Sequence, residues 1–159
     1  MSWPLLFSLT NLVAVLSWAA LLVLPRRPAI LSLVLYAGVG LLCLAYTAMF
    51  VAVFFGGVDP GRVAGAPEGG PAIYFSNYTI EGLRGLFLSD GGMVIGWTHY
   101  LAFDLFVGLW IAHDADAKGF ARAVQLPFLL LTFLAGPIGL LAWLIVRERR
   151  ARQAARAQR

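Results

Sequence analysis

Charged residues are scarce in this sequence: they make up 13% of its 159 residues, whereas a soluble domain typically carries about 25%. Hydrophobic residues make up 60%, which is more apolar surface than a water-soluble fold of this length can bury. Cysteine is scarcer still. Cys43 is the only one, so the chain can form neither an internal disulfide nor a cysteine-based metal site. These shortages exclude a soluble domain and a disulfide-stabilised scaffold, and they indicate a protein surrounded by lipid.

Basic residues are concentrated near the C-terminus, where six of the twelve lie within residues 147–159. A basic tail after an apolar helix usually sets the orientation of a membrane protein or contacts lipid headgroups. No aromatic residues are interleaved with these arginines, which argues against nucleic-acid binding. We therefore expect membrane lipid, and no nucleic acid, as the partner of the tail.

Four apolar stretches are long enough for the roughly 20 residues that a membrane-spanning helix needs. They cover residues 4–24, 29–55, 93–112 and 124–146. None of them alternates polar and apolar residues as the strands of a membrane β-barrel do, and lipid permits only helices or closed barrels to span it. The sequence therefore predicts an all-α integral membrane protein: a four-helix transmembrane bundle within residues 1–150, followed by the basic tail.

The connection over residues 56–92 divides into two parts. Residues 56–71 are rich in glycine and proline, which is typical of a loop. Residues 73–88 carry apolar side chains at helical spacing, with Glu81 and Arg84 on another face. This pattern predicts a short amphipathic helix in the membrane interface, with Asn77 or Thr79 as its N-cap.

Orientation depends on how the basic residues are shared between the two sides. With four spans, both termini and the 56–92 loop lie on one side and carry eight of the twelve basic residues, so the positive-inside rule favours cytoplasmic termini. The pair Arg26 and Arg27 lies in an early short loop on the other side and argues for the opposite orientation. We expect cytoplasmic termini, although the basic residues of the two sides argue for opposite orientations.

Two ionisable side chains lie within a predicted span, where such groups are costly and point to function. They are Asp104 near the middle of the third span and His99 near its start. Helical geometry places Trp97, Tyr100 and Asp104 along one stripe, whereas His99 points roughly 140° away from Asp104. His99 and Glu81 lie near the same end of the bundle and can approach each other. Glu81, His99 and Asp104 are therefore the candidate catalytic residues.

Each candidate also has a structural interpretation. Asp104 could bond Tyr100 or Asn11 and only hold the bundle together. His99 could contact a headgroup or a backbone carbonyl, and Glu81 could form a solvated surface pair with Arg84.

Two further groups of residues leave the same choice open. At the far end of the third span, a structural role is favoured for His113, Asp114 and Asp116, with Asp114 capping or pairing with Lys118 or Arg122, because their spacing matches no strong metal-binding motif. In the fourth span, proline and glycine around Thr132 predict either a kink with close packing or one wall of an elongated apolar cavity.

Four stretches of the sequence are distinctive enough to suggest a family. They read YTIEGLR at 78–84, GWTHYLAFDLFVG at 96–108, LLTF at 130–133 and GPIG at 136–139. Together with Asn11, Trp18 and Pro25 in the first span, they resemble the ABA4-like family. That family is named for the plant abscisic-acid-deficient protein 4, a chloroplast membrane protein required to make neoxanthin.

The resemblance implies the isomerisation of violaxanthin to neoxanthin, in which a 5,6-epoxide opens to an allene and a tertiary alcohol. That reaction needs an acid at the epoxide oxygen and a base for a proton of the ring side chain, roles open to Glu81, His99 and Asp104. The composition, rich in arginine and alanine, is typical of bacteria, most of which make no violaxanthin. We therefore expect a related carotenoid or isoprenoid substrate and a location in a bacterial inner membrane.

The leading hypothesis is a membrane enzyme that isomerises such a lipid at a ring end by acid–base chemistry. Its substrate-binding candidates are Asn11, Arg84, Trp97, Tyr100 and Thr132. The sequence requires no cofactor, although in one variant Glu81, His99 and Asp104 hold a divalent metal. The main alternative is a non-catalytic protein that binds a carotenoid or lipid or assists a neighbouring carotenoid enzyme. A transporter is less well supported, and a homo-oligomer is open in every case.

Overall fold

In the computed structural model, residues 2–61 and 79–157 are described (the last nine by their backbone alone), and all regular structure in these ranges is helical. Along the chain the elements are α1 (Trp3–Val23), α2 (Pro28–Leu33), the π-helix η1 (Val34–Gly40), α3 (Leu41–Phe54), α4 (Ile80–Phe87), α5 (Asp90–Ala117) and α6 (Arg122–Ala157). Since α2, η1 and α3 are continuous, the described chain has four helices long and apolar enough to cross a membrane. The all-α fold class predicted from the sequence is confirmed.

The third of these helices is longer than its apolar stretch predicts at both ends. It begins at Asp90, because the Ser89 hydroxyl accepts a hydrogen bond from the Gly92 amide at 3.0 Å and so caps the first turn. It continues to Ala117, past the apolar limit at Ala112. Apolar residues mark where a helix lies in lipid, whereas its ends are set by capping, so the helix extends beyond the predicted span 93–112 at both ends.

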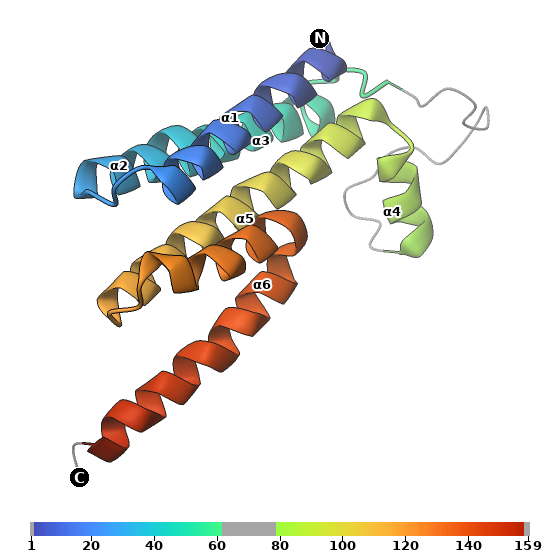
Figure 1. The fold of residues 1–159 in the computed structure, drawn as a ribbon. Helices are drawn as coiled ribbons and strands as arrows, with labels where there is room; N and C mark the ends of the chain where they lie inside the picture. The colour runs from blue at the N-terminus through green and yellow to red at the C-terminus, as the bar shows by residue number, and fades with distance from the viewer. Residues whose placement is uncertain (1, 62–78, 158–159) are drawn as a thin grey trace.

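The short helix predicted over 73–88 is present as α4, from Ile80 to Phe87, while residues 73–78 lie outside the described part of the chain. Thr79, one of the two predicted candidates, is its N-cap: the Thr79 hydroxyl accepts a hydrogen bond from the Gly82 amide at 3.1 Å. The helix packs across the start of α5 (Figure 1). There the Phe87 ring lies against Gly96. This confirms the predicted position of the helix next to the third span.

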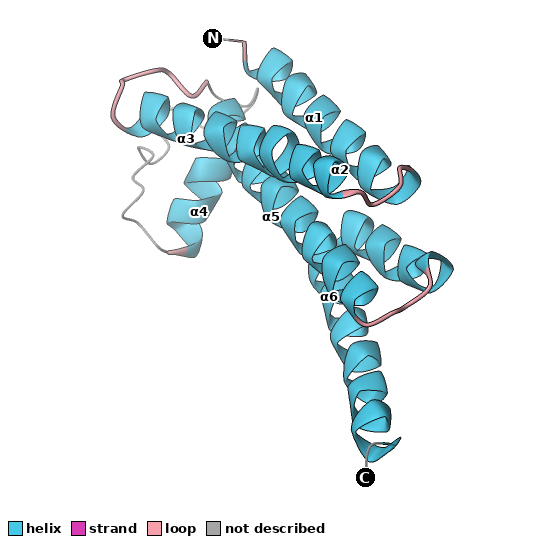
Figure 2. Cartoon of the chain, turned by 90° about the vertical axis from the view of Figure 1, so that its left-hand side faces the viewer, coloured by secondary structure: helices cyan, strands magenta, loops and turns pink. Residues whose placement is uncertain are grey.

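The central element of the bundle is α5. It packs against α1, η1 and α3 on one side, against α6 on another, and against α4 near its N-terminal end (Figures 1 and 2). In the most apolar 18-residue stretch of α5, 50% of the residues are buried, compared with 22–28% in the corresponding stretches of the other three long helices. The outer helices turn leucine, valine and phenylalanine side chains outward, which is the surface expected of helices in lipid.

Small residues allow α1 and its neighbours to pack closely. Gly38 of η1 lies against the Ser17 side chain and Leu105, and Gly108 of α5 lies against the buried indole ring of Trp18. Close packing at glycine is the usual means by which helices associate in membranes, where the hydrophobic effect between helices is weak. The contact between Gly108 and Trp18 therefore fixes the distance between α1 and α5.

We expect Gly108→Ala to destabilise the bundle by about 1–3 kcal/mol, because a Cβ there would overlap the Trp18 ring and overpack the interface. Gly40→Ala is the matched control. Its Cβ would approach nothing closer than the Leu35 carbonyl oxygen at 3.5 Å, an ordinary contact. Unfolding of purified protein in detergent micelles, followed by tryptophan fluorescence, measures both, and equal stability of the two variants would contradict the predicted role of Gly108.

Candidate functional site

The site is built around a break in α6. Ala135 has a non-helical backbone (φ −152°, ψ 52°), and Pro137 follows it. Proline has no amide hydrogen, so the carbonyl four residues earlier loses its usual helical partner. Beyond the break the chain folds back: a Cβ on Gly139 would clash with the backbone nitrogen and hydroxyl of Thr132. The two halves of α6 consequently form a hairpin that opens from the break, as the orange and red segments of Figure 1 show.

Asp104 of α5 lies directly against this break. A Cβ on Gly136 would overlap the Asp104 carboxyl group, so glycine is what lets the α6 backbone approach it. Asp104 is 9% exposed, and its Oδ2 is buried without a hydrogen-bond partner among the described residues. The Tyr100 hydroxyl, one helical turn earlier, is its polar neighbour. A carboxyl and a phenol thus lie together at the middle of an apolar bundle, where either group can accept or donate a proton.

An aromatic strip leads from the surface to Asp104. The Trp97 ring stacks on Tyr100 with centroids 5.2 Å apart and contacts Phe7 of α1 at 6.3 Å. Asn11 fixes this strip, because its Oδ1 accepts a hydrogen bond from Trp97 Nε1 at 3.1 Å. Phe7 and Trp97 are about 40% exposed, so the strip presents flat aromatic surface to lipid. The predicted stripe of Trp97, Tyr100 and Asp104 on one side of the third span is therefore present.

His99 lies elsewhere on α5. It is exposed, and its ring neighbours are Tyr46 of α3 at 5.6 Å and Phe103 at 4.6 Å. No hydrogen bond or ion pair within the described chain joins it to Glu81, which is exposed on α4. Within the described residues, no three His, Cys, Asp or Glu side chains group as metal ligands. The structure does not bring Glu81, His99 and Asp104 together as one catalytic or metal-binding set.

The remaining substrate-binding candidates lie in different parts of the bundle. Arg84 is exposed on α4, on the same short helix as Glu81, while Asn11 and Trp97 form the link between α1 and α5 described above. Thr132 is fully buried, and its hydroxyl donates to the Phe128 carbonyl at 2.8 Å within α6. Thr132 therefore contributes to the packing of the α6 break. The sequence alone had allowed two interpretations of this region, a kink with close packing or one wall of a cavity.

A second polar cluster lies at the end of the bundle where the two short loops meet. Asp114 forms the predicted ion pair with Lys118, and it also binds Arg147 (Nε–Oδ2 2.8 Å) and Trp143 (Nε1–Oδ2 3.0 Å). The Arg147 guanidinium lies over the Trp110 ring, 5.6 Å from its centroid. Both oxygens of Asp114 are thus occupied, by Lys118 just after α5 and by Trp143 and Arg147 of α6, which indicates a structural role for this residue.

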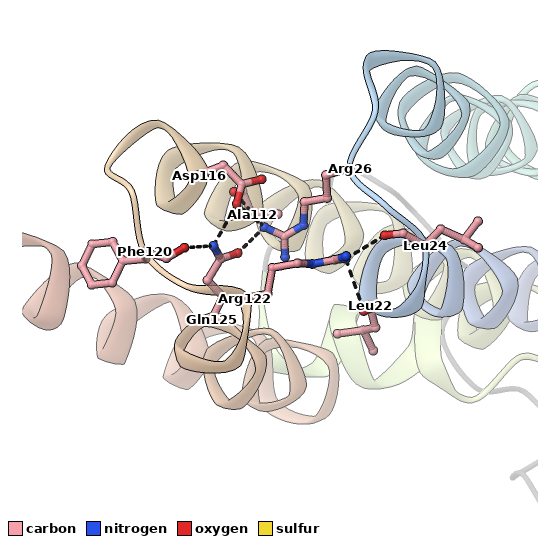
Figure 3. A network of polar contacts seen from close by, with 8 residues as sticks. All are labelled: Leu22, Leu24, Arg26, Ala112, Asp116, Phe120, Arg122 and Gln125. Atoms are coloured by element: carbon pink, nitrogen blue, oxygen red, sulfur yellow. Dashed lines mark hydrogen bonds and ion pairs between the residues drawn. The ribbon is translucent and has the colours of Figure 1, made fainter.

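Beside it, Arg26 reaches from the α1–α2 loop into the bundle (Figure 3). It donates to the Ala112 carbonyl at 3.2 Å, to Asp116 at 2.9 Å and to the Gln125 side-chain oxygen. Gln125, fully buried, holds Asp116 and the Phe120 carbonyl with its amide nitrogen. Sequence reasoning used Arg26 only as a charge and passed over Gln125, although a glutamine inside an apolar stretch is a signal of buried hydrogen bonding.

The comparisons with known proteins agree with the resemblance seen in the sequence. The model of a family described as ABA DEFICIENT 4-like (ABA4-like) matches residues 5–143, from the first turn of α1 to beyond the break in α6. No curated protein and no solved structure matches the chain.

Proposed function

The chain belongs to the ABA4-like family, and on that premise we propose that it is a membrane enzyme that isomerises a carotenoid or related isoprenoid lipid at a ring end. The observation that carries the proposal is Asp104, a carboxyl group 9% exposed at the middle of an apolar bundle, with one oxygen lacking a partner in the described chain. An ionisable residue at this depth is costly and marks a site of function by default.

Asp104 and Tyr100 divide the chemistry between them. Asp104 as carboxylate takes a proton from the carbon next to the ring, and the released electron pair forms a new double bond as the epoxide C–O bond breaks. The Tyr100 hydroxyl protonates the departing oxygen, and the proton then passes from Asp104 to Tyr100 to restore both groups. Atoms and electrons balance within the substrate, so the reaction is an isomerisation that consumes no oxidant.

The aromatic strip is the binding surface that this chemistry needs. A conjugated polyene is flat and apolar, and the rings of Phe7, Trp97 and Tyr100 offer it stacking contacts that end at Asp104. The strip opens toward lipid, where such a substrate is dissolved. Glu81, Arg84 and His99 lie outside this site and take no part in the proposed step.

Expression in a host that makes several carotenoids, epoxides among them, tests the proposal. We expect the chain to produce a new pigment with the same mass as one of the host's pigments but a different retention time and absorption spectrum, because isomerisation conserves mass. Liquid chromatography with mass spectrometry, compared with an empty-vector culture, makes the measurement. An unchanged profile across all carotenoids supplied would contradict an enzymatic role.

A non-catalytic binding role is favoured by one observation. A groove of about 220 Å³ runs between α1 and the α2–η1 segment, lined by apolar side chains and the Ser17 hydroxyl. That hydroxyl already donates its hydrogen to the Val13 carbonyl at 2.7 Å, so the groove offers a ligand apolar contact and no free hydroxyl donor. If the protein only binds its lipid, pigment co-purifies with it and is recovered unchanged after incubation.

A further inference from the structure

Arg122 and Arg147 of α6 lie much closer together than a straight helix allows. From Arg122 to Arg147 a straight helix would rise about 37 Å, at about 1.5 Å per residue. Arg147 instead forms its ion pair with Asp114, which lies just before the α5–α6 loop that leads into Arg122. The first half of α6, residues 122–134, is only about 20 Å long, less than the roughly 30 Å of a bilayer core.

The second half of α6 is held in this position by more than the ion pair. Trp143 is fully buried, with its ring against Phe120 at 5.0 Å and Phe128 at 5.5 Å, and its indole nitrogen bonded to Asp114. Phe120 belongs to the loop that precedes α6 and Phe128 to its first half. The second half therefore packs along the first and returns to the end of the bundle from which α6 started.

The reversal point is suited to the interior of a membrane. Irregular backbone is tolerated at membrane depth only where protein buries it, because unpaired backbone groups are costly in lipid. Gly136 is buried against Asp104 at the middle of α5, and Gly139 against Thr132. The break is thus shielded by α5 and by α6 itself.

We propose that α6 enters and leaves the membrane at the same face, so that the protein has three full spans and one re-entrant helical hairpin, and that this face lies on the anionic cytoplasmic leaflet. The inference is independent of the proposed enzymatic function. It places the N-terminus and the C-terminus on opposite sides, unlike the expectation from four straight spans that both termini share the cytoplasmic side.

Charge complementarity identifies the lipid that this face meets. When the tail joins the two short loops, this face carries ten of the twelve basic residues, with three acidic ones. The opposite face carries two basic residues, Arg62 and Arg84, with four acidic ones. The distribution of basic residues between the two faces, which was ambiguous for four spans, now clearly favours one face. The positive-inside rule assigns that basic face to the cytoplasm. Trp110, 38% exposed beneath Arg147, adds an aromatic anchor of the kind found at headgroup depth.

Single cysteines tested with a membrane-impermeant maleimide decide the arrangement. In a Cys43→Ala background, Ser2→Cys marks the N-terminus, Ala121→Cys the α5–α6 loop and Ala154→Cys the tail. Each full-length variant is labelled in right-side-out and inverted inner-membrane vesicles from a bacterial host. We expect the cysteines at 121 and 154 to react only in inverted vesicles and the cysteine at 2 only in right-side-out vesicles, with at least a tenfold difference in labelling.

Each other outcome has a definite meaning. If the cysteine at 154 reacts on the same side as the cysteine at 2, α6 is a straight span and the re-entrant hairpin is overturned. If those at 121 and 154 react together but only from the outer side, the hairpin stands and the cytoplasmic lipid contact is overturned. Labelling of all three after detergent solubilisation confirms that each cysteine is reactive.

Discussion

Asp104→Asn should lower the rate of pigment conversion by at least about 100-fold, the usual effect of removing a general base, while the protein folds and reaches the membrane normally. Asparagine keeps the volume of the side chain and can still accept a hydrogen bond from Tyr100. It cannot take a proton from carbon at neutral pH, so the chemical step alone is lost. The measurement is the amount of new isomer per unit of membrane-inserted protein in the carotenoid-producing host.

Asp90→Asn is the matched control for this experiment. Asp90 is an exposed carboxylate in the first turn of the same helix, far along α5 from the break in α6, and its replacement should leave conversion unchanged. If Asp104 were only structural, its replacement by a neutral amide would be neutral or stabilising, because the acid is buried with one oxygen unpaired among the described residues, and conversion would continue. Wild-type conversion by a well-folded Asp104→Asn protein therefore rules out the proposed base.

The second large effect should be on stability, from Arg26→Ala, which we expect to cost about 3 kcal/mol. The Arg26 side chain is 7% exposed and donates to a backbone carbonyl, to Asp116 and to Gln125. Its removal leaves the fully buried Gln125 oxygen without that donor. Asp116 is 39% exposed and can turn to solvent, so the loss is smaller than for a pair buried on both sides.

Arg27→Ala provides the matched control, because Arg27 is the next residue, has the same charge and is exposed. Both variants reduce the positive charge of the same loop equally, so a difference between them reports hydrogen bonding inside the bundle and not membrane orientation. Unfolding of the purified proteins in detergent micelles measures the difference. Equal stability of Arg26→Ala and Arg27→Ala would show that the buried network contributes little.

The residues around α4 and α5 show how far local sequence rules reach. Thr79 was one of two predicted caps, and it caps α4 because its hydroxyl accepts from the amide three residues on. The stripe of Trp97, Tyr100 and Asp104 follows from helical periodicity alone. The separation of His99 from Asp104 follows from the same geometry. What periodicity could not show was which face would meet a neighbour: Asp104 faces α6 and is buried, while His99 is exposed.

Sequence by itself determined that this protein is helical and lies in a membrane. Long apolar runs cannot leave backbone groups unpaired in lipid, and a helix pairs them within one segment, so no tertiary contact is needed for that conclusion. The family was also determined at this level, since the family model matches residues 5–143 of the sequence.

Only the tertiary structure decided the course of α6 and the composition of the site. Proline and glycine near residue 136 permit anything from a slight kink to a full reversal. The reversal is selected by contacts from outside the segment, namely Asp114 with Arg147 and Phe120 with Trp143. The same reversal brings Gly136 against the Asp104 carboxyl group and so forms the candidate site. Such contacts join residues far apart in the sequence, and their energies depend on the packing of the whole bundle and not on any local pattern.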